Sequence, residues 1–210
     1  MEISPPQQPI HSWKDFLLHL LTITIGLFIA LTLEAAVESM HHRHLVRQAD
    51  ASLRREIGDN RKLYAINVLK LQLNRNQLAH DIDQLRELRD GRKLDNANLS
   101  WTWDWNSYRD AAWKTAHESG AVSYMDSESI STYSTVYAQQ DYVNATAVAI
   151  LNEESRVGAP LQAARDPARL NAAELEALLV RSAEIDLGFA SLQSTMKALD
   201  NNYQEALSAP

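Results

Sequence analysis

The sequence predicts an all-α protein in which a single N-terminal transmembrane helix continues into an up-and-down antiparallel helical bundle. Three observations predict this fold. An uncharged apolar run lies near the N-terminus, and apolar residues recur at steps of three and four through most of the remaining chain. Only six Gly and six Pro occur in 210 residues, which favours long helices over a turn-rich β architecture.

The apolar run covers residues 16–33 (FLLHLLTITIGLFIALTL) and carries no formal charge. As a helix it would be roughly 27 Å long, close to the hydrocarbon thickness of a bilayer. It is longer than the apolar core of a signal peptide and is followed by residues that keep helical character, so we expect a retained anchor. We place an extended tail at 1–11, rich in Pro and Gln, and the transmembrane helix at 12–37.

A juxtamembrane and long amphipathic helix is predicted over 38–91, with Gly91 as its C-cap. Three asparagines and an arginine (Asn60, Asn67, Asn74 and Arg75) interrupt or flank its apolar face, so it is not an ideal coiled-coil seam. The face itself is formed by Leu53, Ile57, Tyr64, Val68, Leu71, Leu78, Ile82 and Leu85.

Residues 92–210 are expected to complete the bundle. After a polar loop, a short helix is predicted at about 107–119, closed by Gly120. A third helix begins at the N-cap Asp126, has Ile130, Tyr133, Tyr137, Ala147 and Leu151 on one face, and ends at Gly158 and Pro160.

The last helix begins at a capping-box-like pair, Asn171 and Glu174. It shows a strict repeat of apolar positions, which is typical of a helix packed along one stripe. The repeat consists of Leu178, Ser182, Ile185, Phe189, Leu192, Met196, Leu199 and Tyr203.

The composition narrows the functional classes. The net charge is −7 without a basic stripe, which argues against a nucleic-acid partner. The absence of cysteine excludes disulfides, thiolate metal sites and a cysteine nucleophile. The sequence has no phosphate-binding loop, nucleophile elbow, zincin motif or kinase signature, so we expect neither an enzyme nor a cofactor.

Four residues define a candidate helix-packing face in the span: Thr22, Gly26, Ala30 and Glu34, spaced four apart. Small residues at this spacing allow another helix to approach closely, in a homo-oligomer or on a larger membrane protein. The alternative is that such residues are simply ordinary in membrane helices. His19 lies about one turn inside the apolar run, where a neutral imidazole reaches headgroups or a partner's polar atom.

The acidic and histidine residues that follow the span do not predict a metal site. Glu38 and His41 have the spacing used in carboxylate-bridged di-iron bundles, and His42 lies one turn after Glu38. Such sites need a second motif of this kind, and none occurs in the sequence. We expect no metal, and histidines that meet lipid phosphates instead.

Tryptophans concentrate in one short stretch, where four of the five lie within thirteen residues. This candidate docking or ligand patch could line a pocket, anchor the domain at a membrane surface or bind a protein. The alternative is that the rings close one end of the bundle core. Its members are Trp101, Trp103, Trp105, Tyr108 and Trp113.

The stretch 11–64 resembles a group of uncharacterised bacterial single-pass membrane proteins. The shared features are a TIxxGxxIALxxE-type span, a juxtamembrane His/Arg segment and a helix rich in Arg and Glu. The segment 112–121 (AWKTAHESGA), with Tyr133 and Tyr137, resembles their C-terminal half. The resemblance implies a bacterial inner-membrane protein and no activity.

The charges near the span and the resemblance point to different orientations. Lys14 precedes the span, whereas Arg43, Arg47, Arg54 and Arg55 follow it, so the charge rule favours a cytoplasmic C-terminal domain. Related groups carry basic N-terminal tails, which would place the domain in the periplasm. Both orientations stay open.

The sequence therefore predicts a non-enzymatic accessory or scaffold subunit. Its expected partners are the lipid bilayer and, through the span, an integral membrane protein complex or a second copy. The alternative is a membrane-tethered bundle that senses a small ligand near the tryptophans.

Overall fold

The computed structural model describes residues 13–94, 99–100 and 103–208, and over these residues it is helical with no strand. Four α-helices follow one another: α1 (Trp13–Arg89), α2 (Ala111–Glu118), α3 (Ser127–Ala164) and α4 (Ala172–Ser208). Two 3₁₀ turns, η1 (Ala121–Tyr124) and η2 (Pro167–Arg169), lie before α3 and before α4. The predicted all-α class is confirmed. The predicted tail over residues 1–11 lies outside the described residues.

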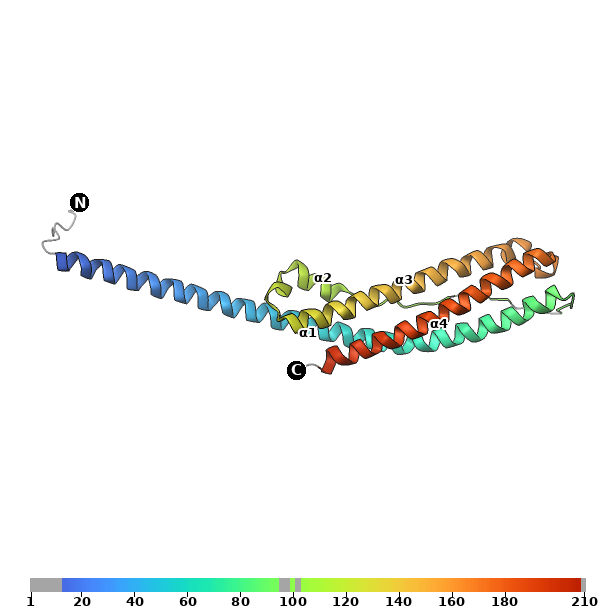
Figure 1. Ribbon diagram of the computed structural model, residues 1–210, viewed down its shortest axis with the longest axis horizontal. Coiled ribbons are helices and arrows are strands. Elements are labelled where there is room, and N and C mark those ends of the chain that lie inside the picture. The colour runs from blue at the N-terminus through green and yellow to red at the C-terminus, as the bar shows by residue number, and fades with distance from the viewer. Residues whose placement is uncertain (1–12, 95–98, 101–102, 209–210) are drawn as a thin grey trace, which may run out of the picture. The chain divides into compact units, whose positions relative to one another are not determined.

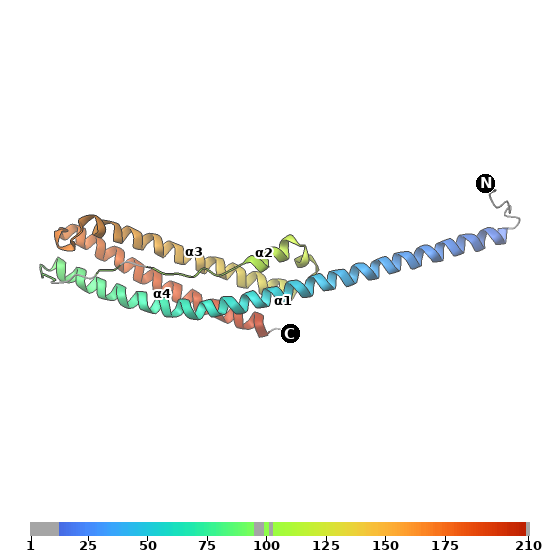
Figure 2. The same ribbon diagram turned by 180° about the vertical axis from the view of Figure 1, so that it is seen from behind.

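The chain divides into two compact units, Met1–Gln48 and Ala49–Pro210. In the first unit, the described residues form the N-terminal part of α1. In the second, the rest of α1 runs beside α3 and α4 (Figures 1 and 2). Here α3 and α4 pack closely on each other. The α1 helix adds buried apolar residues, such as Leu53, Ile57 and Leu85, and polar contacts to both helices.

The helices of the second unit do not alternate in direction throughout. Contacts between α1 and α3 advance together along both helices, from Glu56 with Tyr137 to Asn60 with Gln140, so these helices are parallel. Ion pairs between α1 and α4 run in opposite order, from Arg61 with Asp200 to Arg89 with Glu176, so α4 is antiparallel to both. The described part of the segment between α1 and α2 returns along α1, since Ser100, Asn106 and Arg109 contact Asp81, Asn67 and Asn60 in turn.

Most of the predicted helix ends are confirmed. Gly91 ends α1 in the left-handed conformation (φ 78°), which favours glycine, and Arg92 N–H donates to Glu87 O at 3.0 Å. Asp126 caps α3 by accepting from Ser129 N–H at 2.8 Å. Asn171 and Glu174 form a reciprocal capping box at the start of α4.

The predicted buried face of α4 is also confirmed, since all eight of its positions are buried. Six of them are apolar residues of the bundle core. Tyr203 adds a hydroxyl that donates to Gln140 Oε1 of α3. Ser182 is tolerated because its hydroxyl donates to Leu178 O at 2.7 Å, one turn back in the same helix.

Three predictions of local structure were wrong. The short helix begins at Ala111 rather than at 107, because residues 103–110 are extended. Gly158 and Pro160 do not end α3, which continues to Ala164. A proline removes one helical hydrogen bond, but Val157 and Leu161 on either side are buried and hold the helix in place.

The third correction concerns two apolar residues assigned to buried faces. Val68 and Leu151 are 37% and 43% exposed, respectively. Their places are taken by neighbours, because Asn67 and Ile150 are the residues that point into the bundle.

Candidate functional site

An extended segment, residues 103–110, lies between α1 and α3, and we call it the strap. Two asparagines of α1 bind its backbone as a neighbouring β-strand would. Asn60 Oδ1 accepts from Arg109 N–H at 2.9 Å, and its amide donates to Arg109 O at 2.7 Å. Asn67 binds Asn106 in the same way, at 3.2 and 2.8 Å.

The α3 side of the strap is bound by the same chemistry. Asn144 Oδ1 accepts from Tyr108 N–H at 3.1 Å, and its amide donates to Tyr108 O at 3.3 Å. Gln140 donates to Arg109 O at 3.0 Å, while its carbonyl accepts from Asn60 and from the Tyr203 hydroxyl of α4. This buried network joins the strap to all three long helices.

The register of α1 against the strap follows a heptad of polar residues. Asn60, Asn67, Asn74 and Asp81 are seven residues apart, which is about 10.5 Å along a helix and about three residues of extended chain. The bound backbone positions are 109, 106 and, at Asp81, Ser100, whose N–H donates to Asp81 Oδ2 at 3.3 Å. Asn74 instead donates to Lys70 O within α1.

This site was missed from the sequence, although its signal was visible. From the sequence alone, Asn60, Asn67 and Asn74 appear only as interruptions of the apolar face of α1. An amide repeated every seven residues on a buried face has no reason to be there unless a backbone lies against it, because a buried polar group needs a partner.

The aromatic residues of the strap pack inward. Trp103 stacks on Trp105 (ring centroids 5.7 Å apart) and touches Phe189 of α4 (5.1 Å). Tyr108 is 5% exposed and meets the edge of Tyr203. Trp113 lies in α2 and stacks on Tyr137 of α3, a separate contact. Trp101 lies outside the described residues.

Two carboxylates of α1, Glu56 and Asp50, accept hydrogen bonds from α2 and α3. Glu56 accepts from Ala112 N–H at 3.0 Å and from the Tyr137 hydroxyl at 2.8 Å. It therefore caps α2 from another helix, since Asp110 at the start of α2 makes no capping bond. Asp50 likewise accepts from the Tyr133 hydroxyl and from Arg54.

Two further acids, Asp81 of α1 and Glu154 of α3, are buried in the bundle. Asp81 is fully buried, and burial raises its pKa to about 6, although bonds from Gln77 and Ser100 oppose the shift. Glu154 is 5% exposed, and burial, with the nearby Asp81 charge, raises its pKa to about 7. Glu154 Oε2 is buried and has no hydrogen-bond partner.

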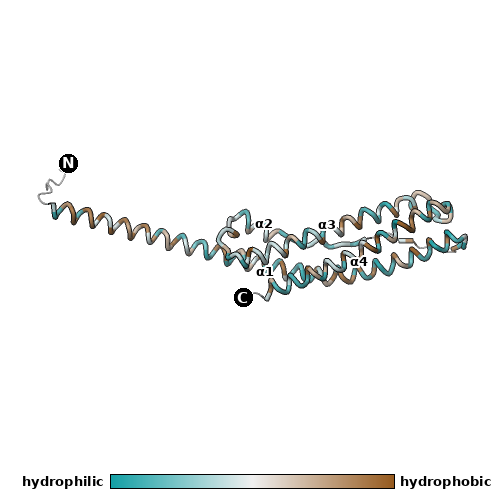
Figure 3. The backbone as a smooth tube through the Cα atoms, viewed as in Figure 1, coloured by the Kyte–Doolittle hydropathy of each residue, from teal (hydrophilic) through white to brown (hydrophobic). Residues whose placement is uncertain are grey.

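The first unit contains a helix long and apolar enough to cross a membrane. None of the most apolar 18-residue window of α1 is buried, and large apolar side chains such as Ile23, Phe28 and Leu33 are more than 60% exposed. Figure 3 shows this apolar N-terminal stretch as a mainly brown segment. The hydroxyls of Thr22, Thr24 and Thr32 donate to carbonyls one turn earlier, as an apolar environment requires.

The remaining candidates lie on the exposed surface of the same helix. Thr22, Gly26, Ala30 and Glu34 are all exposed, and a Cβ added at Gly26 would meet nothing within 4 Å. His19 Nδ1 lies 3.3 Å from Asp15 O. Glu38 and His42 are 3.9 Å apart, and the described residues bring no third potential metal ligand to them.

Comparisons of the chain with protein-family models, with curated proteins and with solved structures find no match.

Proposed function

We propose that the chain is a non-enzymatic, membrane-anchored accessory subunit. In this proposal, the span packs on a larger membrane protein complex, and the helical domain docks against an extramembrane surface of that complex. A bacterial inner membrane is the expected location, with the domain on either side.

The observation that carries the proposal is the exposure of the N-terminal part of α1. Apolar side chains around the whole helix are uncovered from Trp13 to Leu33, far more apolar surface than a helix in water tolerates. Lipid accounts for most of this surface. The small residues at 22, 26 and 30 support a protein neighbour on one side, since packing drives association between helices in lipid.

A second group of exposed apolar residues supports docking by the helical domain. Ile66, Leu69 and Leu73 lie on one face of α1 in the second unit and are 45%, 67% and 68% exposed. Their spacing of three and four makes them a continuous stripe rather than scattered residues. The buried amides of α1 and α3 bind the strap and one another, which supports a structural role for them rather than catalysis.

The test is the size of the complex in the native membrane. After extraction with a mild detergent, the chain should co-migrate with a larger assembly on native gels and in size-exclusion chromatography with light scattering. The Gly26→Leu variant should lower the assembled fraction several-fold. Thr24→Leu is the matched control, because Thr24 lies on the opposite side of the helix, about 200° around from Gly26.

The result decides between partners as well. A second copy of this chain as the only other component would favour a homo-oligomer. A monomer under mild extraction, or equal loss in both variants, would overturn the proposal.

A further inference from the structure

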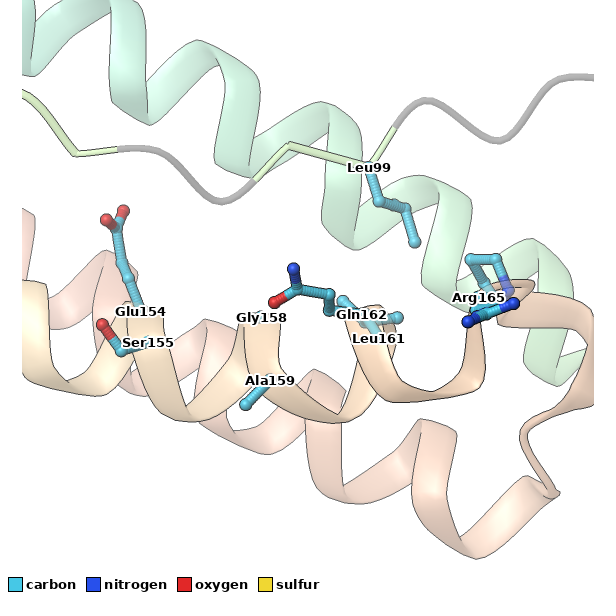
Figure 4. Close-up of a pocket in the computed structure, with 9 residues that line it drawn as sticks. Leu99, Glu154, Ser155, Gly158, Ala159, Leu161, Gln162 and Arg165 are labelled. Atoms are coloured by element: carbon cyan, nitrogen blue, oxygen red, sulfur yellow. The ribbon is translucent and has the colours of Figure 1, made fainter.

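A cavity of about 510 Å³ opens beside the C-terminal half of α3 (Figure 4). Its volume lies within the range of small-molecule sites, roughly 300–1,000 Å³. Leu99, Leu161 and Pro167 supply apolar walls, and Gly158 and Ala159 leave space along the helix. This cavity is distinct from the tryptophan patch, and the inference drawn from it goes beyond the proposed function.

Glu154 closes the inner end of the cavity. Figure 4 shows its carboxyl group pointing from α3 into the space that Leu99 and Gln162 also border. The side chain is 5% exposed, and Oε2 has neither a hydrogen-bond partner nor contact with solvent. Buried acceptors are almost always satisfied, so an incompletely paired carboxyl group on a residue that lines a cavity points to a donor there.

Among the described residues, no donor bonds to Glu154 Oε2. Asp81, whose charge helps to raise the Glu154 pKa, is itself an acid and cannot donate as a carboxylate. Its oxygens accept from Gln77 and Ser100. Among the described residues that line the cavity, Glu154 is the one acid, and its carboxylate favours a positively charged donor. A primary ammonium fits, because it carries a positive charge and three N–H donors in a small volume.

The rest of the lining defines the body of the occupant. The apolar and small residues next to Glu154 accept an alkyl or aromatic group. Arg165, the C-cap residue of α3, lines the end of the cavity away from Glu154 (Figure 4). Its guanidinium has the same charge as an ammonium, so a second amine at that end is disfavoured.

We propose that this cavity binds a small primary monoamine with an apolar body, whose ammonium group donates to the Glu154 carboxylate. Glu154 would bind the ammonium group, and the wall of the cavity along Gly158 would contact the apolar body. Polyamines and neutral isosteres of the amine would bind more weakly.

The experiment measures binding of benzylamine to the full chain in detergent by isothermal titration calorimetry. Benzyl alcohol and 1,6-diaminohexane are titrated in parallel, so that partitioning into the micelle is measured separately. Benzylamine should bind at least ~10-fold more tightly than either comparison compound, as a charge-assisted hydrogen bond predicts.

Two variants and a control make the assignment specific. Glu154→Gln keeps the shape of the side chain and should weaken benzylamine binding at least ~10-fold. Gly158→Leu should abolish binding by filling the cavity, since Gly158 lines it. Glu184→Gln, at an exposed position of α4, should leave binding unchanged.

The proposal fails if benzylamine does not bind, or if benzyl alcohol binds equally well. It fails also if Glu154→Gln binds benzylamine as the wild type does. Thermal melts followed by circular dichroism establish that each variant is folded. Neither result depends on whether the chain assembles with a membrane complex.

Discussion

Asparagine side chains hold the backbone of the strap between α1 and α3. An amide side chain presents one acceptor and two donors in a plane, so it can bind both groups of a peptide as a neighbouring strand does. Asn60, Asn67 and Asn144 each do so, and two of these three belong to one helix. The strap therefore satisfies its backbone without a sheet.

Replacing Asn67 with alanine should destabilise the fold strongly. The change leaves the Asn106 N–H and C=O without their partners in a buried place, which costs about 2–4 kcal/mol. Urea or thermal unfolding followed by circular dichroism measures the loss. Asn152→Ala, at an exposed position of α3, is the control and should change stability by less than about 0.5 kcal/mol. Equal effects in the two variants would show that Asn67 does not hold the strap.

The acids Asp81 and Glu154 make the stability depend on pH. Their folded pKa values, about 6 and about 7, lie above the unfolded values of 3.8 and 4.5, so the folded state binds more protons between these limits. Stability is therefore greatest at the acidic end of this window and falls as pH rises towards 7. For Glu154 alone the loss is about 3 kcal/mol between pH 4.5 and pH 8.

Thermal melts between pH 5 and pH 8 check this dependence. Glu154→Gln should flatten the curve and raise the midpoint at pH 8, since it removes a buried charge. Other groups face these acids, chiefly His80 beside Asp81, so part of the slope should persist in the variant. A midpoint that rises from pH 5 to pH 8 in the wild type would contradict the assignment.

At the scale of elements, α2 depends on a residue 56 positions earlier in the chain. It has only eight residues, too few for a stable helix alone, and its N-terminus is bound by Glu56. Glu56→Ala should therefore loosen α2 and cost about 1–2 kcal/mol. Hydrogen exchange should quicken at residues 113–118 more than in α4. Glu128→Ala, at an exposed position in the first turn of α3, is the comparison, and equal changes in both variants would argue against capping by Glu56.

The long helices could be predicted because their signals are local. The repeat in α4, the capping boxes and Gly91 each act within one or two turns, so a single sequence contains them fully. The end of α3 could not be read this way. Pro160 disfavours a helix locally, but burial of Val157 and Leu161 in the bundle outweighs that preference.

The strap and the acid pair could not be predicted from the sequence either, because both depend on residues far apart in the chain. Residues 103–110 carry no strand pattern, and their conformation depends on amides from α1 and α3 that lie 31 to 49 positions away. Glu154 looks like any charge on a helix until Asp81 is placed beside it. Only the heptad of Asn60, Asn67 and Asn74 indicated that the buried face of α1 was adapted to a polar neighbour.

At the scale of the whole molecule, the two units have different requirements. The described part of the first unit has no core of its own and exposes its apolar side chains, whereas the second buries an apolar core, the strap network and the acid pair. If the second unit holds all the interactions that stabilise the bundle, it should not need the span to fold. In the proposed function, the membrane would set the location of the chain and the bundle would make its extramembrane contacts.

A fragment of residues 49–210 should therefore be soluble without detergent and unfold cooperatively. Its helix content should match that of the same residues in the full chain, since Asn60, Glu56 and the ion pairs to α4 all lie within it. Circular dichroism with urea unfolding measures both properties, and Asn67→Ala should weaken the fragment as it weakens the full chain. A fragment that aggregates or melts without a transition would show that the bundle depends on the membrane-proximal part of α1.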